Sequence, residues 1–286
     1  MSTTTVQAAI DDYTATRRWS EKTARGCGYT LDGFALATGN PPIDQLTHEH
    51  VAAWWETRKG LAPSTARNRR SVVSNFLEWC RATGRMTHDP MAGIPVPKEP
   101  RRMPTVLDDE EVRQLLKAVP DARGFAIVVL MWTLGFRCVD VAQLQVHDVD
   151  FRRRMIRVTG KGGNEDVLPL PPFVARAIDR YLTDHPAPAG PLFRTHTDPP
   201  RPMSAQLVSD LLRDWMLDAG LKRHRHDGIG AHALRRTCAT DLLDQGVSVR
   251  KVQAVMRHAS LTSTERYLRR SDAEELRGIL EGREPR

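Results

Sequence analysis

The chain has 286 residues, 40% of them hydrophobic and 27% charged, which is typical of a globular protein and excludes a disordered chain or a fibre. Its formal net charge is +7 at pH 7, carried mostly by arginine. This balance fits a polyanionic partner such as DNA, because guanidinium groups pair with phosphate oxygens, and it fits a coding bias towards arginine equally well. The four cysteines form no C-x-x-C pair, which favours reduced thiols in a cytoplasmic protein.

Residues 1–92 are predicted to form an all-helical domain. The chain starts without a basic segment followed by an apolar run, so we expect no signal peptide. Apolar residues recur at helical spacing around Trp54 and Phe76, and Gly60 and Gly84 stand where helices would end. The last of these helices carries three arginines in its early turns, Arg67, Arg69 and Arg70. Such a cluster is more often a solvated face than a DNA contact.

A proline-rich segment follows, and it indicates a linker over residues 93–104. Proline removes backbone donors and disfavours helix in the residue before it, so G-I-P-V-P-K-E-P-R-R-M-P should be extended. The sequence therefore predicts a second domain over residues 105–286.

This second domain is predicted to be mainly helical with a small antiparallel sheet. The apolar stretch from Phe125 to Phe136 is too short to span a bilayer and is typical of a buried helix that ends at Gly135. Residues 155–159 and 166–170 have strand character, and the G-K-G-G-N segment between them places Lys161 on a β-hairpin turn. Helical patterns return after Pro172.

Six residues of this domain could bind or act on one phosphate: Arg137, Lys161, His232, Arg235, His258 and Tyr267. Taken singly, each is a weak signal, because a buried arginine is usually a salt-bridge partner, a His/Arg pair usually lies on the surface and a lone tyrosine usually packs in the core. His232 and Arg235 are three residues apart, so they share a helix face.

The order R…K…H-x-x-R…H…Y, in the segments T-L-G-F-R-C-V-D, A-H-A-L-R-R-T and M-R-H, resembles that of the tyrosine recombinase (phage integrase) family. The resemblance extends over essentially the whole chain as far as Tyr267. It implies a C-shaped DNA clamp made of a SAM-like core-binding domain and an α+β catalytic domain. It also implies a site-specific recombinase that integrates or excises a phage or mobile element through a 3′-phosphotyrosine intermediate and a Holliday junction, without a metal ion or ATP.

The resemblance also implies a role for each residue of the motif. Arg137 and Arg235 would neutralise the charge that develops on the phosphate, as fixed guanidinium groups can. His232 would take the proton of the nucleophile, whose unperturbed pKa is about 10. Lys161 would protonate the departing 5′-oxygen.

The remaining motif residues complete the expected site. His258 would donate to a phosphate oxygen, Tyr267 would be the nucleophile, and Asp140 would orient the site rather than react. Three positions depart from the commonest family pattern, because Asp140 replaces Glu, Arg236 replaces His and Arg257 replaces Gly. These departures concern the fine geometry of the site and remove no reacting group.

The resemblance implies double-stranded core-site DNA as the partner and a homotetramer on two synapsed duplexes, with the free protein a monomer or weak oligomer. We expect a segment of residues 272–281 to pack on a neighbouring protomer, the alternative being that it caps its own domain. A directionality factor is a further possible partner, and the expected location is the nucleoid of a bacterial cytoplasm. The DNA-binding candidates are Arg67, Arg69, Arg70, Arg101, Arg102, Arg236 and Arg266.

Several alternatives stay open or are disfavoured. A type IB topoisomerase shares the phosphotyrosine chemistry, and a non-catalytic DNA-binding protein shares the basic charge. A zinc site is disfavoured because its ligands would lack the paired spacing of structural sites; those residues are His224, His226, His232, His258 and Cys238. Integration, excision and chromosome-dimer resolution are not distinguished by the residues.

Overall fold

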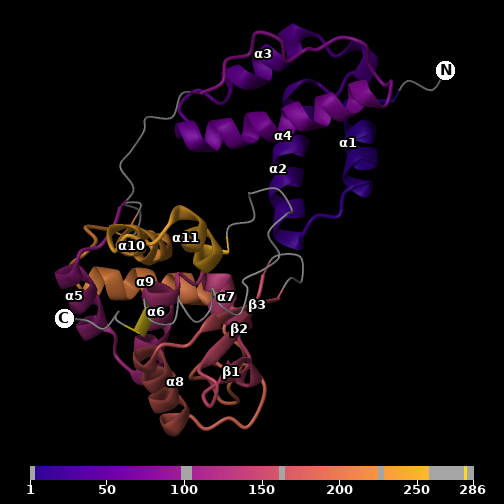
Figure 1. Cartoon of the computed structure of the whole chain (residues 1–286). Helices are drawn as coiled ribbons and strands as arrows, with labels where there is room; N and C mark the ends of the chain where they lie inside the picture. Colours follow the sequence, from indigo (N-terminus) through magenta and orange to yellow (C-terminus); the bar gives the residue numbers. More distant parts are fainter. Residues whose placement is uncertain (1–3, 98–104, 161–164, 225–228, 258–279, 282–286) are drawn as a thin grey trace. The chain divides into compact units, whose positions relative to one another are not determined.

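The computed structural model describes residues 4–97, 105–160, 165–224, 229–257 and 280–281. The chain forms two compact units, Met1–Arg102 and Met103–Arg286 (Figure 1). Each unit has a hydrophobic core of its own.

The described part of the first unit is helical. Its helices are α1 (Val6–Ala15), α2 (Glu21–Ala37), α3 (His48–Glu56) and α4 (Pro63–Ala82), with a short 3-10 turn at Ile43–Gln45. Aromatic rings fill the core: Phe34 meets Trp54 edge to face with ring centroids 5.3 Å apart, and it also meets Phe76. Buried aromatic pairs of this kind stabilise a fold beyond the area they bury.

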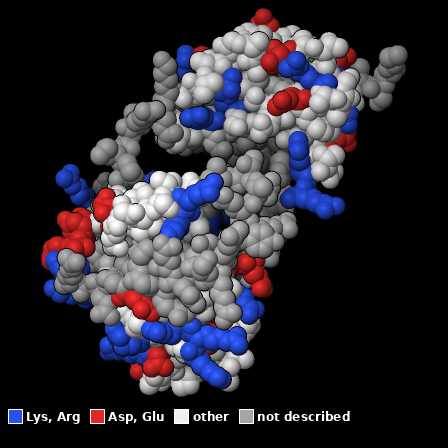
Figure 2. All heavy atoms as spheres, viewed as in Figure 1, with Lys and Arg blue, Asp and Glu red and all other residues white. Residues whose placement is uncertain are grey.

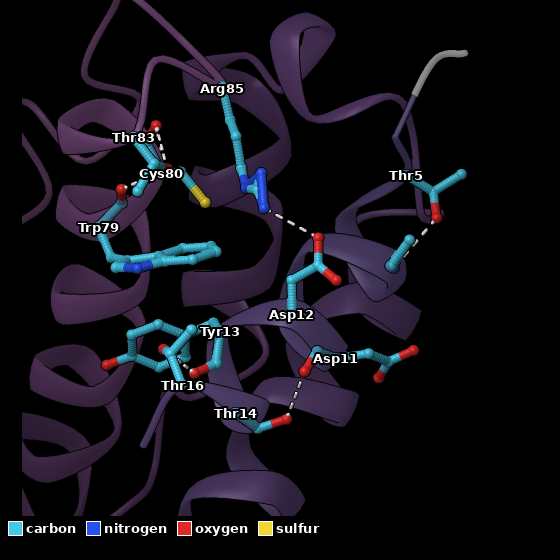
Figure 3. A network of polar contacts seen from close by, with 11 residues as sticks. Thr5, Asp11, Asp12, Tyr13, Thr14, Thr16, Trp79, Cys80, Thr83 and Arg85 are labelled. Atoms are coloured by element: carbon cyan, nitrogen blue, oxygen red, sulfur yellow. Dashed lines mark hydrogen bonds and ion pairs between the residues drawn. The ribbon is translucent and has the colours of Figure 1, made fainter.

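A polar and aromatic cluster joins α1 to the end of α4 (Figure 3). Arg85 donates to Asp12 across 2.9 Å, and its guanidinium lies 4.6 Å from the centroid of the Trp79 ring. Tyr13 lies beneath the same indole, with ring centroids 5.3 Å apart. The Asp12 side chain is 56% exposed, so the ion pair contributes at most about 1 kcal/mol. Burial of the Tyr13 ring contributes more to this contact.

The second unit combines helices with a three-stranded sheet. Its helices are α5 (Asp109–Ala118), α6 (Ala122–Leu134), α7 (Cys138–Gln143), α8 (Pro172–Asp184), α9 (Ala205–Asp218), α10 (Ala231–Asp244) and α11 (Val249–Met256), with a 3-10 turn at Val146–Asp148. The antiparallel sheet has the order β1 (Val149–Asp150), β2 (Met155–Thr159), β3 (Glu165–Pro169). The predicted mixed fold with a small antiparallel sheet is confirmed, and β1 is a strand that the sequence did not predict.

Helix α6 is the centre of the second unit. Asp121 begins it by accepting a hydrogen bond from the Gly124 amide at 2.6 Å. From Arg123 to Leu134 every residue except Phe125 is buried, as the continuous apolar run predicts. It packs against α8 and α10, and Gly135 ends it with a φ of 62°. Within the described part of the chain, no helix has the length and apolarity needed to cross a membrane.

The C-terminal end of the described chain packs on its own unit. Leu280 is fully buried in the core of the second unit, and Glu281 forms a 3.0 Å ion pair with Arg154. At these two residues the tail packs on its own domain, because the apolar Leu280 side chain is buried in the core of that domain. Leu280 and Glu281 therefore contact their own domain, as the alternative expectation has it. The packing of the segment on a neighbouring protomer stays a prediction, and residues 272–279 lie outside the described ranges.

Candidate active site

Arg137 is the N-cap residue of α7 and lies two residues after Gly135, the glycine that ends α6. Its backbone amide donates to an Asp140 carboxylate oxygen at 2.8 Å, which caps the first turn of the helix. Its Nη2 donates to the Arg257 carbonyl at 3.3 Å, and its side chain is 33% exposed. The Arg137 guanidinium is therefore anchored from one side while part of it faces solvent.

Arg235, on α10, is buried and joins the ends of two other helices. Its Nη1 donates to the carbonyl of Gly135 after α6, and its Nη2 donates to the carbonyl of Met256 at the end of α11. Burial, followed by the charges of Arg137 and Arg257, lowers the pKa of Arg235 to about 10. The group stays protonated at neutral pH, so two cationic side chains converge where α6 and α11 end.

His232 lies on α10 one turn before Arg235. Its pKa is lowered from the ordinary value of 6.5, first by burial and then by Arg236, Arg235 and Arg137. An imidazole of this kind is neutral at neutral pH and can accept a proton. The predicted shared helix face of His232 and Arg235 is present in the structure.

Asp140 and Arg257 form a buried ion pair beside these groups. The Arg257 Nη2 lies 2.5 Å from the Asp140 carboxylate, and each side chain is 4% exposed. The Arg257 guanidinium also lies 4.7 Å from the centroid of the Phe136 ring. Its backbone is left-handed, with a φ of 50°. The sequence marks Arg257 only as a departure from a common glycine, and its signal is a long cationic side chain at a position where a small residue is usual.

Asp166 brings the hairpin close to this pair. It lies on β3 opposite Val158. Burial raises its pKa, while the Arg257 charge lowers it and the Asp140 charge raises it. Lys161 falls between the ends of β2 and β3, in the part of the chain outside the described residues.

The structure thus brings together Arg137, Asp140, His232 and Arg235, together with the unpredicted Arg257. Several other predicted residues lie outside the described ranges, namely Lys161, His258, Arg266, Tyr267 and the linker residues Arg101 and Arg102. Arg236 is exposed on α10. Among the described residues no group of three or more His, Cys, Asp or Glu is placed to hold a metal ion.

The three arginines of α4 differ in their surroundings. Arg69 lies 5.6 Å from the ring centroid of Tyr29, which is 72% exposed. Arg70 instead donates to the carbonyl of Ile94 at 3.0 Å, a contact inside its own unit. Figure 2 shows lysines and arginines exposed on both units. Within this cluster, Arg67 is exposed, whereas Arg69 and Arg70 are each half-buried.

Comparison with known proteins shows the family of this chain. Residues 105–274 match the phage integrase family, and residues 6–95 match the phage integrase central domain. The chain belongs to the phage integrase family. The predicted resemblance is confirmed, and the match over residues 105–274 spans all six motif positions.

Curated relatives of this family member are tyrosine recombinases. The chain is 30% identical to tyrosine recombinase XerD of Caulobacter vibrioides, over 82% of this chain and 80% of the relative. It is 27% identical to tyrosine recombinase XerC of Xanthomonas campestris, over 90% of this chain and 80% of the relative. The protein is therefore a tyrosine recombinase, an enzyme of the class that exchanges DNA strands.

Solved structures of integrases share the fold. The integrase from mycobacterium phage Brujita is 26% identical, with a TM-score of 0.55 over 96% of this chain and 90% of that one. A lambda integrase dimer bound to a COC′ core site is 19% identical, with a TM-score of 0.73 over 92% of this chain and 100% of that one. The second likeness shows the fold alone.

Proposed function

We propose that this recombinase cleaves a specific DNA core site through a covalent bond between Tyr267 and the 3′-phosphate, and then joins the strand to a second duplex. The observation that carries the proposal is the convergence of Arg137 and Arg235 at the carbonyls that follow α6 and α11. Two fixed guanidinium groups suit a phosphoryl group whose non-bridging oxygens gain negative charge during attack.

The proton transfers follow from the neighbouring groups. His232 is neutral at neutral pH and is the residue proposed to take the Tyr267 proton. Lys161, on the turn between β2 and β3, is proposed to give a proton to the departing 5′-oxygen. Asp140 holds the backbone of Arg137 in place and takes no part in proton transfer.

The proposed partner is double-stranded core-site DNA, bound by four protomers on two duplexes. A solved lambda integrase, which shares the fold, is a tetramer bound to a Holliday junction. Arg67 and Arg69 of α4 are proposed to contact the phosphate backbone, which positions a protein on DNA without reading its sequence.

Two biological roles are compatible with this chemistry. Integration or excision of a phage or mobile element is the first, and its support is the phage integrase match. Resolution of chromosome dimers is the second; it is favoured by the curated relatives, which are named XerC and XerD.

Covalent capture tests the shared chemistry. The protein is incubated with a library of random duplexes that carry a nick, and adducts that survive denaturation are recovered and sequenced. We expect a recurrent core site from the unaltered protein and no adduct from Tyr267→Phe, which should bind the recovered site within a few-fold of the parent. An adduct with Tyr267→Phe would contradict the assignment of the nucleophile.

Two labelled duplexes of the recovered site then separate a recombinase from a topoisomerase. A recombinase joins them through a Holliday junction, whereas a topoisomerase reseals the strand that it cut. Relaxation of supercoiled plasmid without any joined product would contradict the recombinase proposal.

A further inference from the structure

One residue, Arg257, holds both members of the Arg137–Asp140 pair. Its carbonyl accepts a hydrogen bond from the Arg137 guanidinium at 3.3 Å, and its own guanidinium contacts Asp140 at 2.5 Å. These contacts join residues 117 and 120 positions apart in the chain. Arg257 is therefore in direct contact with both neighbours through different parts of the same residue.

The two guanidinium groups compete for one carboxylate. The same Asp140 oxygen lies 2.5 Å from Arg257 and 3.9 Å from the Arg137 Nη1. A carboxylate that formed a two-pronged pair with Arg137 would occupy the donors that a DNA phosphate needs. The shorter contact shows that Asp140 is paired with Arg257, and the Arg137 side chain is left 33% exposed.

The backbone at Arg257 adds an independent observation. Its φ of 50° lies in the left-handed region, which glycine adopts freely and which costs other residues free energy. A glycine would satisfy the turn, so the turn alone does not account for an arginine here. The side chain is also packed, with its guanidinium 4.7 Å from the centroid of the Phe136 ring.

We propose that Arg257 is a positioning residue that holds the Asp140 carboxylate away from the Arg137 guanidinium, so that Arg137 keeps its charge and donors for the DNA phosphate. This inference rests on the proposed function, in which Arg137 binds the phosphate. The Arg257 side chain is buried, and it acts through Asp140 and Arg137.

Arg257→Gly tests the inference, because glycine keeps the left-handed turn and removes only the side chain. The freed Asp140 carboxylate is expected to move onto Arg137. Single-turnover cleavage of the captured core site should slow by about tenfold or more, short of the roughly 10²–10³-fold loss that follows removal of a preorganised donor. DNA binding should change only a few-fold.

Charge removal at Asp140 should rescue this variant. Asparagine keeps the oxygen that accepts from the Arg137 amide but does not neutralise a guanidinium, so Arg257→Gly combined with Asp140→Asn should recover most of the cleavage rate. Asp140→Asn alone should not behave like the parent, because it leaves the Arg257 charge buried without a carboxylate. A merely structural role of Arg257 would not produce rescue by a second substitution.

Each outcome decides the question. The inference is overturned if Arg257→Gly cleaves at the parental rate. It is also overturned if Arg257→Gly cleaves slowly and the added Asp140→Asn substitution does not restore the rate. If Arg257→Gly does not give a folded protein by circular dichroism, Arg257→Gln decides in the same way, since it retains most of the volume and removes the charge. Arg137→Ala separates a failure of the proposed function from a failure of this inference. If Arg137→Ala cleaves at the parental rate, the proposed function is overturned. If Arg137→Ala cleaves slowly but Arg257→Gly cleaves at the parental rate, only the inference about Arg257 is overturned.

Discussion

Gly135→Ala should destabilise the catalytic unit more than the same substitution at a helix end where no atom lies near the added Cβ. Gly135 has a φ of 62°, and a Cβ added there would collide with the Met256 Cε and lie 2.9 Å from its Sδ. Gly220, after α9, has a φ of 72° and has no atom within 4 Å of an added Cβ. Gly220→Ala is therefore a matched control, with the same backbone conformation but no collision.

The expected magnitudes follow from these two environments. A left-handed backbone costs an alanine about 1–2 kcal/mol at either position. Crowding against Met256 adds roughly 1–3 kcal/mol at Gly135 only, towards the low end if the flexible methionine moves aside. In a domain of this size each kcal/mol lowers the Tm by about 2–4 °C, so Gly135→Ala should melt roughly 2–12 °C below Gly220→Ala.

Differential scanning calorimetry of the full chain measures the Tm of the catalytic unit in each variant. Because the Gly135 carbonyl accepts from Arg235, Gly135→Ala should also slow core-site cleavage well below its Tm, while Gly220→Ala should not. Equal melting temperatures for the two variants would refute the argument, since they would show that Met256 yields to the added methyl group without cost.

Three further predictions concern single groups. Lys161→Ala should slow cleavage by about 10²–10⁴-fold because the departing 5′-oxygen loses its proton donor. A substrate with a 5′-bridging phosphorothiolate should restore much of the rate. If it does not, Lys161 serves only in DNA binding or in the structure of the hairpin. Burial and the nearby arginines lower the pKa of His232 from its ordinary value of 6.5, so more than half of the rings stay neutral at that pH. The acid limb of the cleavage rate should therefore lie below pH 6.5, and it should be absent from the residual activity of His232→Asn. An acid limb above that value, or one unchanged in the variant, would contradict the role of His232 as base. Leu280→Ala should lower the free energy of unfolding of the catalytic unit by about 2–5 kcal/mol, because the side chain is fully buried; unchanged chemical denaturation would show that the tail does not contribute to the core.

Local patterns predicted the elements that depend on neighbouring residues. The apolar run after Arg123 predicted the buried helix α6, and the G-K-G-G-N segment predicted the hairpin, since turn chemistry and periodicity act over a few residues. The pairing of His232 with Arg235 on one helix face follows from spacing alone.

Long-range contacts could not be predicted in this way. The pairing of Asp140 with Arg257 joins residues 117 positions apart, and no periodicity encodes it. The hydrogen bond from the Arg70 guanidinium to the Ile94 carbonyl, 24 residues away, is likewise encoded by no local pattern. Strand β1 has only two residues, so its pairing with β2 rather than its own sequence defines it.

The anchoring of Arg235 by the carbonyls of Gly135 and Met256 affects how the site receives an anion. The carbonyl end of a helix carries a partial negative charge from its aligned peptide dipoles. The Arg235 guanidinium therefore makes favourable electrostatic contacts at the ends of two helices. Its partners there are backbone carbonyls, which carry no net charge and are fixed parts of the chain. The partners of these two nitrogens are carbonyls, so an arriving phosphate does not have to displace a carboxylate from them. The helix dipoles stabilise the buried Arg235 cation without neutralising the positive charge that attracts the phosphate.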